Sequence, residues 1–154
     1  MQYNYNHIFL ENRQISNTSA IRWSCFTAMV IGIAWIFTLF HIISVPALAF
    51  QIIAPVSIFI LLLPAVVNHL MHLSDILLVG SKGINLLTGL ILGCNLTAVF
   101  LLSSTLSHYA SIIWLLPTLI ACQYYSKRIT SHIFLGGFVA VSYTHLRAHE
   151  TELH

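Results

Sequence analysis

The sequence predicts an all-α membrane protein, a polytopic bundle of transmembrane helices, on three observations. The 154 residues include only 6 Lys or Arg and 4 Asp or Glu, and 58% are hydrophobic, whereas a soluble domain carries about 25% charged residues. Residues 23–74 and residues 83–126 contain no charged side chain. A crossing needs about 20 apolar residues, so each run accommodates two. The net charge of +2 provides no basic face for a nucleic acid, and we expect the lipid bilayer to be the main partner.

The charge-free runs divide at short polar turns, which gives four complete crossings and a truncated fifth. The transmembrane domain that they form covers residues 20–140 and follows a polar, Asn-rich tail over residues 1–19. The crossings are expected at about residues 21–43, 47–67, 84–102, 107–125 and, for the truncated one, 129–140.

Individual residues support these boundaries. Arg22 and Trp23 suit the membrane interface at which the first crossing begins. A Ser-Val-Pro turn at residues 44–46 separates the first crossing from the second. Pro55 and Pro117 fall inside the second and fourth crossings, where a proline removes a backbone donor and is expected to kink the helix.

The composition changes abruptly after residue 140. Residues 141–151 read VSYTHLRAHET, a sequence that resembles the conceptual translation of a transposase-based sequencing adapter. Segments of this kind are excluded from reasoning about a fold. We therefore treat residues 141–154 as a non-native tail, and we expect the natural protein to continue differently beyond residue 140.

The basic residues predict the orientation of the crossings, because Lys and Arg concentrate in short cytoplasmic loops. With the crossings counted as above, all five basic residues before the tail fall on one side of the membrane. They are Arg13, Arg22, Lys82, Lys127 and Arg128. This pattern predicts a multi-pass protein whose N-terminus is cytoplasmic.

No pattern of catalytic or ligand-binding residues stands out. Apart from the arginine that opens the first crossing, the crossings contain none of the Asp, Glu, Lys and Arg residues that form ion paths and proton relays. Cys25, Cys94 and Cys122 lie on different helices without C-x-x-C spacing, so we interpret them as packing residues. His41 and His108 could ligate a haem between two helices, but nothing beside them requires one. We expect no enzymatic activity, metal or cofactor in this fragment.

Three residues of the third crossing suggest contacts between helices. Gly89 and Gly93 have the G-x-x-x-G spacing that lets helices approach closely in a membrane. We favour a contact inside the bundle, and a contact between two copies in a homodimer is the alternative. Asn95 is strongly polar, and we expect it to face another helix because an unsatisfied amide in hydrocarbon is costly.

From residue 108 to residue 130 the chain reads HYASIIWLLPTLIACQYYSKRIT. This stretch, with the layout of crossings before it, resembles the N-terminal multi-pass membrane region of bacterial signalling proteins of the Firmicutes type, such as membrane-anchored GGDEF diguanylate cyclases and histidine kinases. The resemblance singles out as candidate signalling or packing residues His108, Trp114, Pro117, Tyr124, Tyr125 and Arg128, with Leu116 and Thr130 also matching.

The resemblance implies an anchor or sensor module in the bacterial cytoplasmic membrane. The chain contains no GGDEF or kinase sequence, so a cytoplasmic output domain is expected downstream of it. Tyr124 and Tyr125 are expected at the inner interface, where Lys127 and Arg128 would hold the end of the helix at the anionic leaflet. A helix held there and bent at Pro117 could carry motion inward. Simple anchoring is the interpretation that we favour for these residues. The alternative function is a fragment of a multi-pass transporter or permease, which would continue as further crossings.

Overall fold

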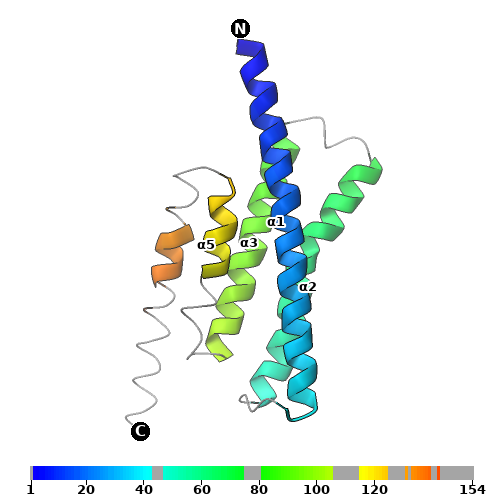
Figure 1. The fold of residues 1–154 in the computed structure, drawn as a ribbon, viewed down its shortest axis with the longest axis vertical. Coiled ribbons are helices and arrows are strands. Elements are labelled where there is room, and N and C mark those ends of the chain that lie inside the picture. The colour runs from blue at the N-terminus through cyan, green and yellow to red at the C-terminus, as the bar shows by residue number, and fades with distance from the viewer. Residues whose placement is uncertain are drawn as a thin grey trace.

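Three long helices dominate the structure, a computed structural model that describes residues 2–42, 47–74, 81–105, 115–124, 131, 133–139 and 142. Helix α1 covers Gln2–Leu39, α2 covers Ala47–Ser74 and α3 covers Ser81–Thr105. A shorter helix, α5, covers Leu115–Cys122, and residues 133–139 are also helical. The described part of the chain is therefore all-α (Figure 1).

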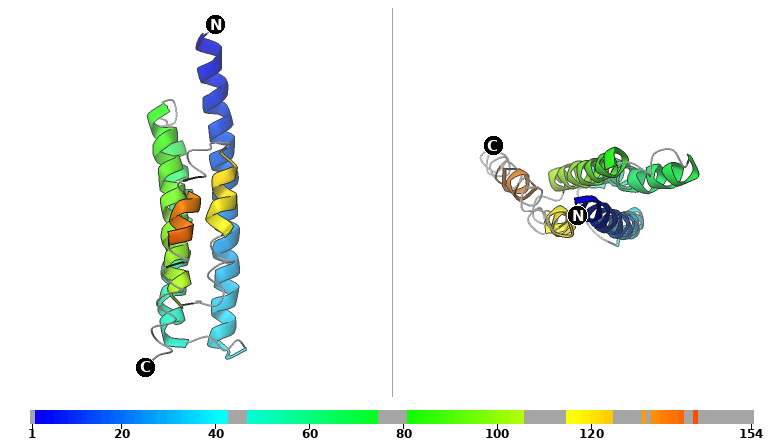
Figure 2. Two further views of the ribbon diagram at one scale, coloured as in Figure 1. Left: turned by 90° about the vertical axis from the view of Figure 1, so that its left-hand side faces the viewer. Right: turned by 90° about the horizontal axis from the view of Figure 1, so that it is seen from above.

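Helices α1 and α3 run parallel to each other. Helix α2, which lies between them in the sequence, runs in the opposite direction. At one end of the bundle Ala20 and Ile91 pack with Met71, which lies late in α2. At the other end Leu102 packs with Phe50, which lies early in α2. The helices form two layers, with α1 beside α5 in one and α2 beside α3 in the other (Figure 2).

The three long helices are each long and apolar enough to cross a membrane. The candidate spans are Ile8–Leu39, Ala49–His72 and Lys82–Thr105. Large apolar side chains such as Phe26 and Phe59 point outward from them, as expected where the surroundings are lipid chains rather than water. The chain is thus a multi-pass membrane segment in contact with the bilayer.

A fourth complete crossing is not seen among the described residues. Helix α5 covers eight residues of the predicted crossing at 107–125, and its Pro117 and Ile120 side chains are buried. Residues 106–114 and 125–130 lie outside the described part of the chain. The fourth crossing and the truncated fifth stay predictions, as does the non-native tail, which lies outside the described residues except for residue 142.

The first helix begins much earlier than the sequence suggested. We expected a crossing from about residue 21 behind a polar tail, whereas α1 is continuous from Gln2. The polar residues of the supposed tail belong to the helix, and Asn17 is only 2% exposed. Polarity does not prevent this packing because the Asn17 amide hydrogen-bonds to α3 and to the turn after α5.

The connection between the second and third helices is also shorter than the gap between the expected crossings, which end near residue 67 and begin near residue 84. Helix α2 continues to Ser74 because Met71 packs in the core against Ala20 and Leu87. Pro55 and Pro64 lie inside α2, and Pro64 is fully buried. Helix α2 crosses behind α1 and diverges from it towards Ser74 (Figure 1).

A Schellman motif ends α1. The Ile42 N–H donates to the Phe37 carbonyl at 2.9 Å, and the His41 N–H donates to the Thr38 carbonyl at 3.1 Å. His41 occupies the position at which glycine is usual, and its φ of 55° is left-handed. Histidine is among the residues that tolerate this conformation better than most, at some cost in free energy. The helix therefore ends at Leu39, close to the predicted end of the first crossing.

Candidate functional site, a polar junction of three helices

The most concentrated polar contact in the described residues surrounds Asn17, at the end of the bundle where α3 begins. The Asn17 Nδ2 donates to the Ile84 carbonyl at 3.3 Å. The Thr88 hydroxyl shares its hydrogen between Asn17 Oδ1 at 3.0 Å and the Ile84 carbonyl at 2.8 Å, and the Tyr124 hydroxyl donates to Asn17 Oδ1 at 2.9 Å. One amide therefore joins α1 to α3 and to the turn that follows α5.

Two further hydrogen bonds surround this contact. Arg13 Nη1 donates to Asn85 Oδ1, which links the preceding turn of α1 to the start of α3. The Ser16 hydroxyl lies 3.1 Å from the Gln123 carbonyl, at the C-terminal end of α5. We call Arg13, Ser16, Asn17, Asn85, Thr88, Gln123 and Tyr124 the polar junction.

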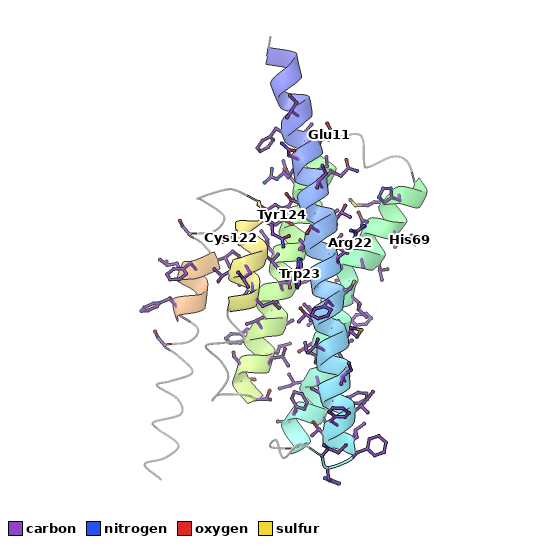
Figure 3. All side chains as sticks on the ribbon, viewed as in Figure 1. Glu11, Arg22, Trp23, His69, Cys122 and Tyr124 are labelled. Carbon is purple, nitrogen blue, oxygen red and sulfur yellow. The ribbon has the colours of Figure 1, made fainter. Side chains whose placement is uncertain are left out.

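The polar junction lies where α5 ends, and Tyr124 is placed between α5 and α1 (Figure 3). Arg13 and Lys82 belong to the same end of the bundle, which we call the basic end. Because a hydrogen bond between helices has little competition from water near or inside a bilayer, the junction holds these three segments in a defined arrangement.

A second polar pair joins α1 and α3 one heptad further into the bundle. Asn95 Nδ2 donates to Ser24 Oγ at 2.8 Å and to the Ile91 carbonyl at 2.8 Å. The Ser24 hydroxyl donates to the Ala20 carbonyl at 3.0 Å. Ser24 and Asn95 are both 0% exposed, and Asn95 Oδ1 is buried without a hydrogen-bond partner. The structure thus places the Asn95 amide against another helix.

The junction and the pair contain amides, hydroxyls and one guanidinium, which suits positioning of helices rather than covalent chemistry. Among the described residues, no group of three or more His, Cys, Asp and Glu is placed to hold a metal ion. Cys25 is half-buried on α1, Cys94 is buried on α3 and Cys122 is exposed on α5, and all three are free thiols.

The structure describes two of the six candidate signalling residues. Tyr124 belongs to the polar junction, and Pro117 is buried in α5. The kink expected at Pro117 stays a prediction because the residues before α5 are not described. The remaining four also lie outside the described residues: His108, Trp114, Tyr125 and Arg128.

Gly89 and Gly93 make no close contact with another helix among the described residues, so the contact that we favoured for them inside the bundle stays a prediction. Both are exposed, and a Cβ built on either would meet no atom within 4 Å among the described residues. The reason is their position around α3. At about 100° per residue, Gly93 is about 200° from Asn95, which faces α1. Among the described residues, close packing of α3 against α1 uses the Asn95 face.

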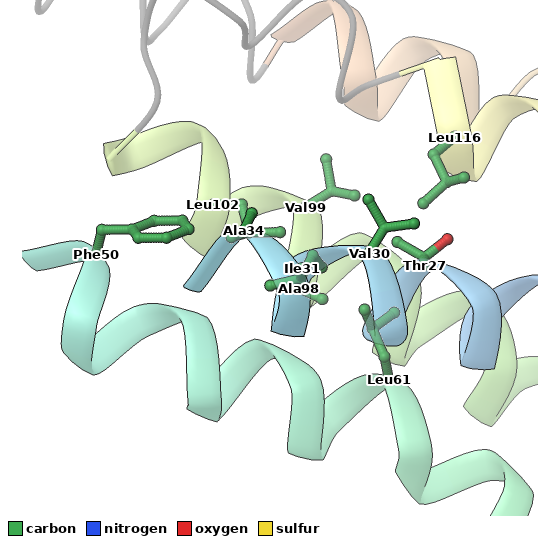
Figure 4. Close-up of a pocket in the computed structure, with 10 residues that line it drawn as sticks. All are labelled: Thr27, Val30, Ile31, Ala34, Phe50, Leu61, Ala98, Val99, Leu102 and Leu116. Carbon is green, nitrogen blue, oxygen red and sulfur yellow. The ribbon is translucent and has the colours of Figure 1, made fainter. Parts of the chain in front are cut away.

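An apolar cavity of about 200 Å³ lies between α1, α2, α3 and α5 (Figure 4). Val30, Phe50 and Val99 are among the residues that line it. Among the described residues that line it, Thr27 alone carries a hydroxyl, which donates to the Trp23 carbonyl in its own helix. A polar substrate would find no free partner among these described lining residues, so the cavity suits an apolar occupant.

Comparisons of the chain with family models, with curated proteins and with solved structures found no match. The function is therefore inferred from the residues of the chain alone.

Sequence reasoning missed Asn17 and Ser24, and one signal could have found them. The polar residues Asn17 and Ser24 are seven apart on α1, as are Thr88 and Asn95 on α3, which is the spacing of a helix–helix seam.

Proposed function

We propose that this chain is the membrane anchor and sensor module of a bacterial signal-transduction protein, with its cytoplasmic output domain encoded downstream. The observation that supports the proposal is the polar junction. It connects two membrane-spanning helices to the turn after α5, which is the last part of the chain before the basic pair Lys127 and Arg128. A displacement of α1 or α3 would reach the segment that leads towards an output domain.

The proposal includes a fourth crossing over residues 107–125 and a cytoplasmic basic end. Helix α5 supplies an apolar, partly buried segment inside that range. Arg13 and Lys82, which lie at the same end of the described bundle, support the assignment of this end to the cytoplasm. The basic residues would also hold this end at the anionic leaflet.

The contiguous reading frame beyond residue 140 in the source genome tests the proposal. We expect one or two more crossings followed by a cytoplasmic signalling domain. A frame that stops after the fifth crossing would contradict the proposal. A frame that continues as a long series of crossings would instead support the alternative, a transporter or permease component.

A second experiment tests the role of the junction in the full-length parent. Tyr124→Phe removes the hydrogen bond to Asn17 but keeps the aromatic ring, so we expect basal output to change while the protein still inserts. The matched control is Thr97→Val, because Thr97 is exposed and its hydroxyl bonds only to the Gly93 carbonyl of its own helix. An equal output from both variants would argue against coupling through the junction.

A further inference from the structure

The contacts between α1 and α3 follow one seam with a constant offset along the sequence. Asn17 meets Thr88 and Ser24 meets Asn95, so each pair is separated by 71 residues. The two pairs are one heptad apart on both helices. One heptad further on, at the same offset, Ile31 packs against the apolar cluster that contains Leu102. This is the pattern of two parallel helices that pack along a repeating seam.

Polar residues on such a seam specify its register. A buried amide in a parallel helix pair favours the alignment in which it finds its partner, at some expense of stability. A slip of one heptad would place Asn95 beside Ile31, where its Nδ2 would lose the Ser24 oxygen. The same slip would break the contact between Asn17 and Thr88. Apolar side chains alone discriminate less between neighbouring alignments because Leu, Ile and Ala contacts can be remade after a slip.

We propose that Asn17–Thr88 and Ser24–Asn95 form a register lock that holds α1 and α3 in one parallel alignment. Tyr124 donates to the same Asn17 oxygen, so the lock also fixes the end of α5 relative to the pair. The proposal concerns the packing of these helices and does not depend on the signalling function. Its consequence is that α1, α3 and the end of α5 move as one unit.

Disulfide crosslinking in membranes tests the lock. In a chain with Cys25, Cys94 and Cys122 replaced by Ala, the pair Ala20→Cys with Ile91→Cys reports the native register, because both residues belong to one buried cluster. Ala20→Cys with Ile84→Cys reports the slip of one heptad that places Asn95 beside Ile31, because it has the same offset of 64 residues. The chain with the lock intact should crosslink only through the first pair.

The lock is removed by Asn17→Leu combined with Asn95→Leu, which takes one amide from each pair. The variant loses three hydrogen bonds between α1 and α3, so we expect the slipped crosslink to increase roughly twentyfold, in line with the usual strength of such bonds between membrane helices. A matched control combines Ser57→Ala with Thr97→Val, which removes two hydroxyls outside the seam, and it should crosslink as the parent does.

A gentler variant, Ser24→Ala with Thr88→Val, keeps both amides and covers the case in which the double leucine variant fails to accumulate. It loses the two hydrogen bonds of the lock but keeps the bond from Asn17 to the Ile84 carbonyl, so it should raise the slipped crosslink by a smaller factor, about eightfold. Suppose that both variants accumulate, crosslink only through Ala20→Cys and Ile91→Cys, and do so with the same crosslinking yield as the parent. Apolar packing alone then sets the register, and the lock is refuted. The same conclusion follows from the gentler variant alone when it is the only one that accumulates.

Discussion

Replacing Asn17 with Ala should be the most destabilising single change in the polar junction. The amide of Asn17 takes part in three hydrogen bonds, to the Ile84 carbonyl and to the hydroxyls of Thr88 and Tyr124. A hydrogen bond between membrane helices contributes about 0.6 kcal/mol on average and about 1.7 kcal/mol at most. The change would also leave the Tyr124 hydroxyl without its acceptor, which costs about 1–3 kcal/mol.

Together these terms predict that Asn17→Ala lowers the free energy of unfolding by about 2–4 kcal/mol. Tyr124→Phe removes a single bond and should lower it by about 0.5–1.5 kcal/mol. The Thr88 hydroxyl should add little to the loss of stability in Asn17→Ala. It lies 2.8 Å from the Ile84 carbonyl and keeps that hydrogen-bond acceptor.

The assay is reversible unfolding in mixed micelles or bicelles, followed by circular dichroism, for the parent, both single variants and the double variant. The double-mutant cycle should give a coupling of about 1 kcal/mol between Asn17 and Tyr124. Thr18→Ala is the control on the same helix, since Thr18 is exposed and bonds only to the Gln14 carbonyl, and it should change stability by less than about 0.5 kcal/mol. If the free-energy changes of Asn17→Ala and Tyr124→Phe are additive in the double variant, the two residues are not coupled. A loss of stability in Asn17→Ala no larger than that in Thr18→Ala would also refute the central place of Asn17 in the polar junction.

Three further changes test other parts of the fold in the same assay. His41→Gly should raise the free energy of unfolding by up to about 1 kcal/mol, because glycine adopts the positive φ at the end of α1 without strain, and a loss of stability would contradict this account of the motif. Ala28→Leu should lower it by about 1–3 kcal/mol, because Ala28 is buried with Leu61 and Ala98 where three helices meet, and a neutral result would mean that this contact is loose. Gly93→Val should leave the stability of the single chain nearly unchanged, since its Cβ would enter open space, whereas a loss of self-association in the same variant would assign the glycine face to a homodimer.

The long apolar helices could be predicted from the sequence because charged side chains are costly in hydrocarbon, so membrane-spanning segments appear as runs without charged residues. The third crossing was expected at residues 84–102, and α3 covers Ser81–Thr105. The second was expected to end near residue 67, and α2 continues to Ser74 because Met71 is buried against α1 and α3. Hydropathy alone does not reveal burial of this kind at the end of a helix.

The N-terminal half of α1 was missed for a related reason. Its Asn and Ser residues look like a solvated tail when they are considered one at a time, and their partners lie far away in the sequence. Asn17 is satisfied by residues that are 67 to 107 positions distant. The heptad spacing of Asn17 and Ser24 was the available signal, but it predicts a partner helix only after Thr88 and Asn95 are recognised as the matching pair.

The G-x-x-x-G spacing shows a different limit of prediction from sequence, because here a contact was expected rather than missed. It indicates that two backbones can approach, but the spacing does not say whether the partner belongs to the same chain. Asn95 lies only two residues from Gly93 and faces α1, so the glycines fall on another side of the same helix. A polar residue near the motif was therefore the better guide to the face that packs inside the bundle.

Labelling of single cysteines with a membrane-impermeant thiol reagent tests the central claim most directly. The claim is that α1 and α2 each cross the membrane and that the basic end faces the cytoplasm. Gln14, Ile42 and His72 are suitable positions because all three are exposed. Gln14 lies in the N-terminal half of α1, Ile42 just after its last residue, and His72 near the C-terminal end of α2. In the background without Cys25, Cys94 and Cys122, Ile42→Cys should react in intact spheroplasts, and Gln14→Cys and His72→Cys should react only after permeabilisation. Reaction of Gln14→Cys and Ile42→Cys from the same side would contradict the claim that α1 crosses the membrane.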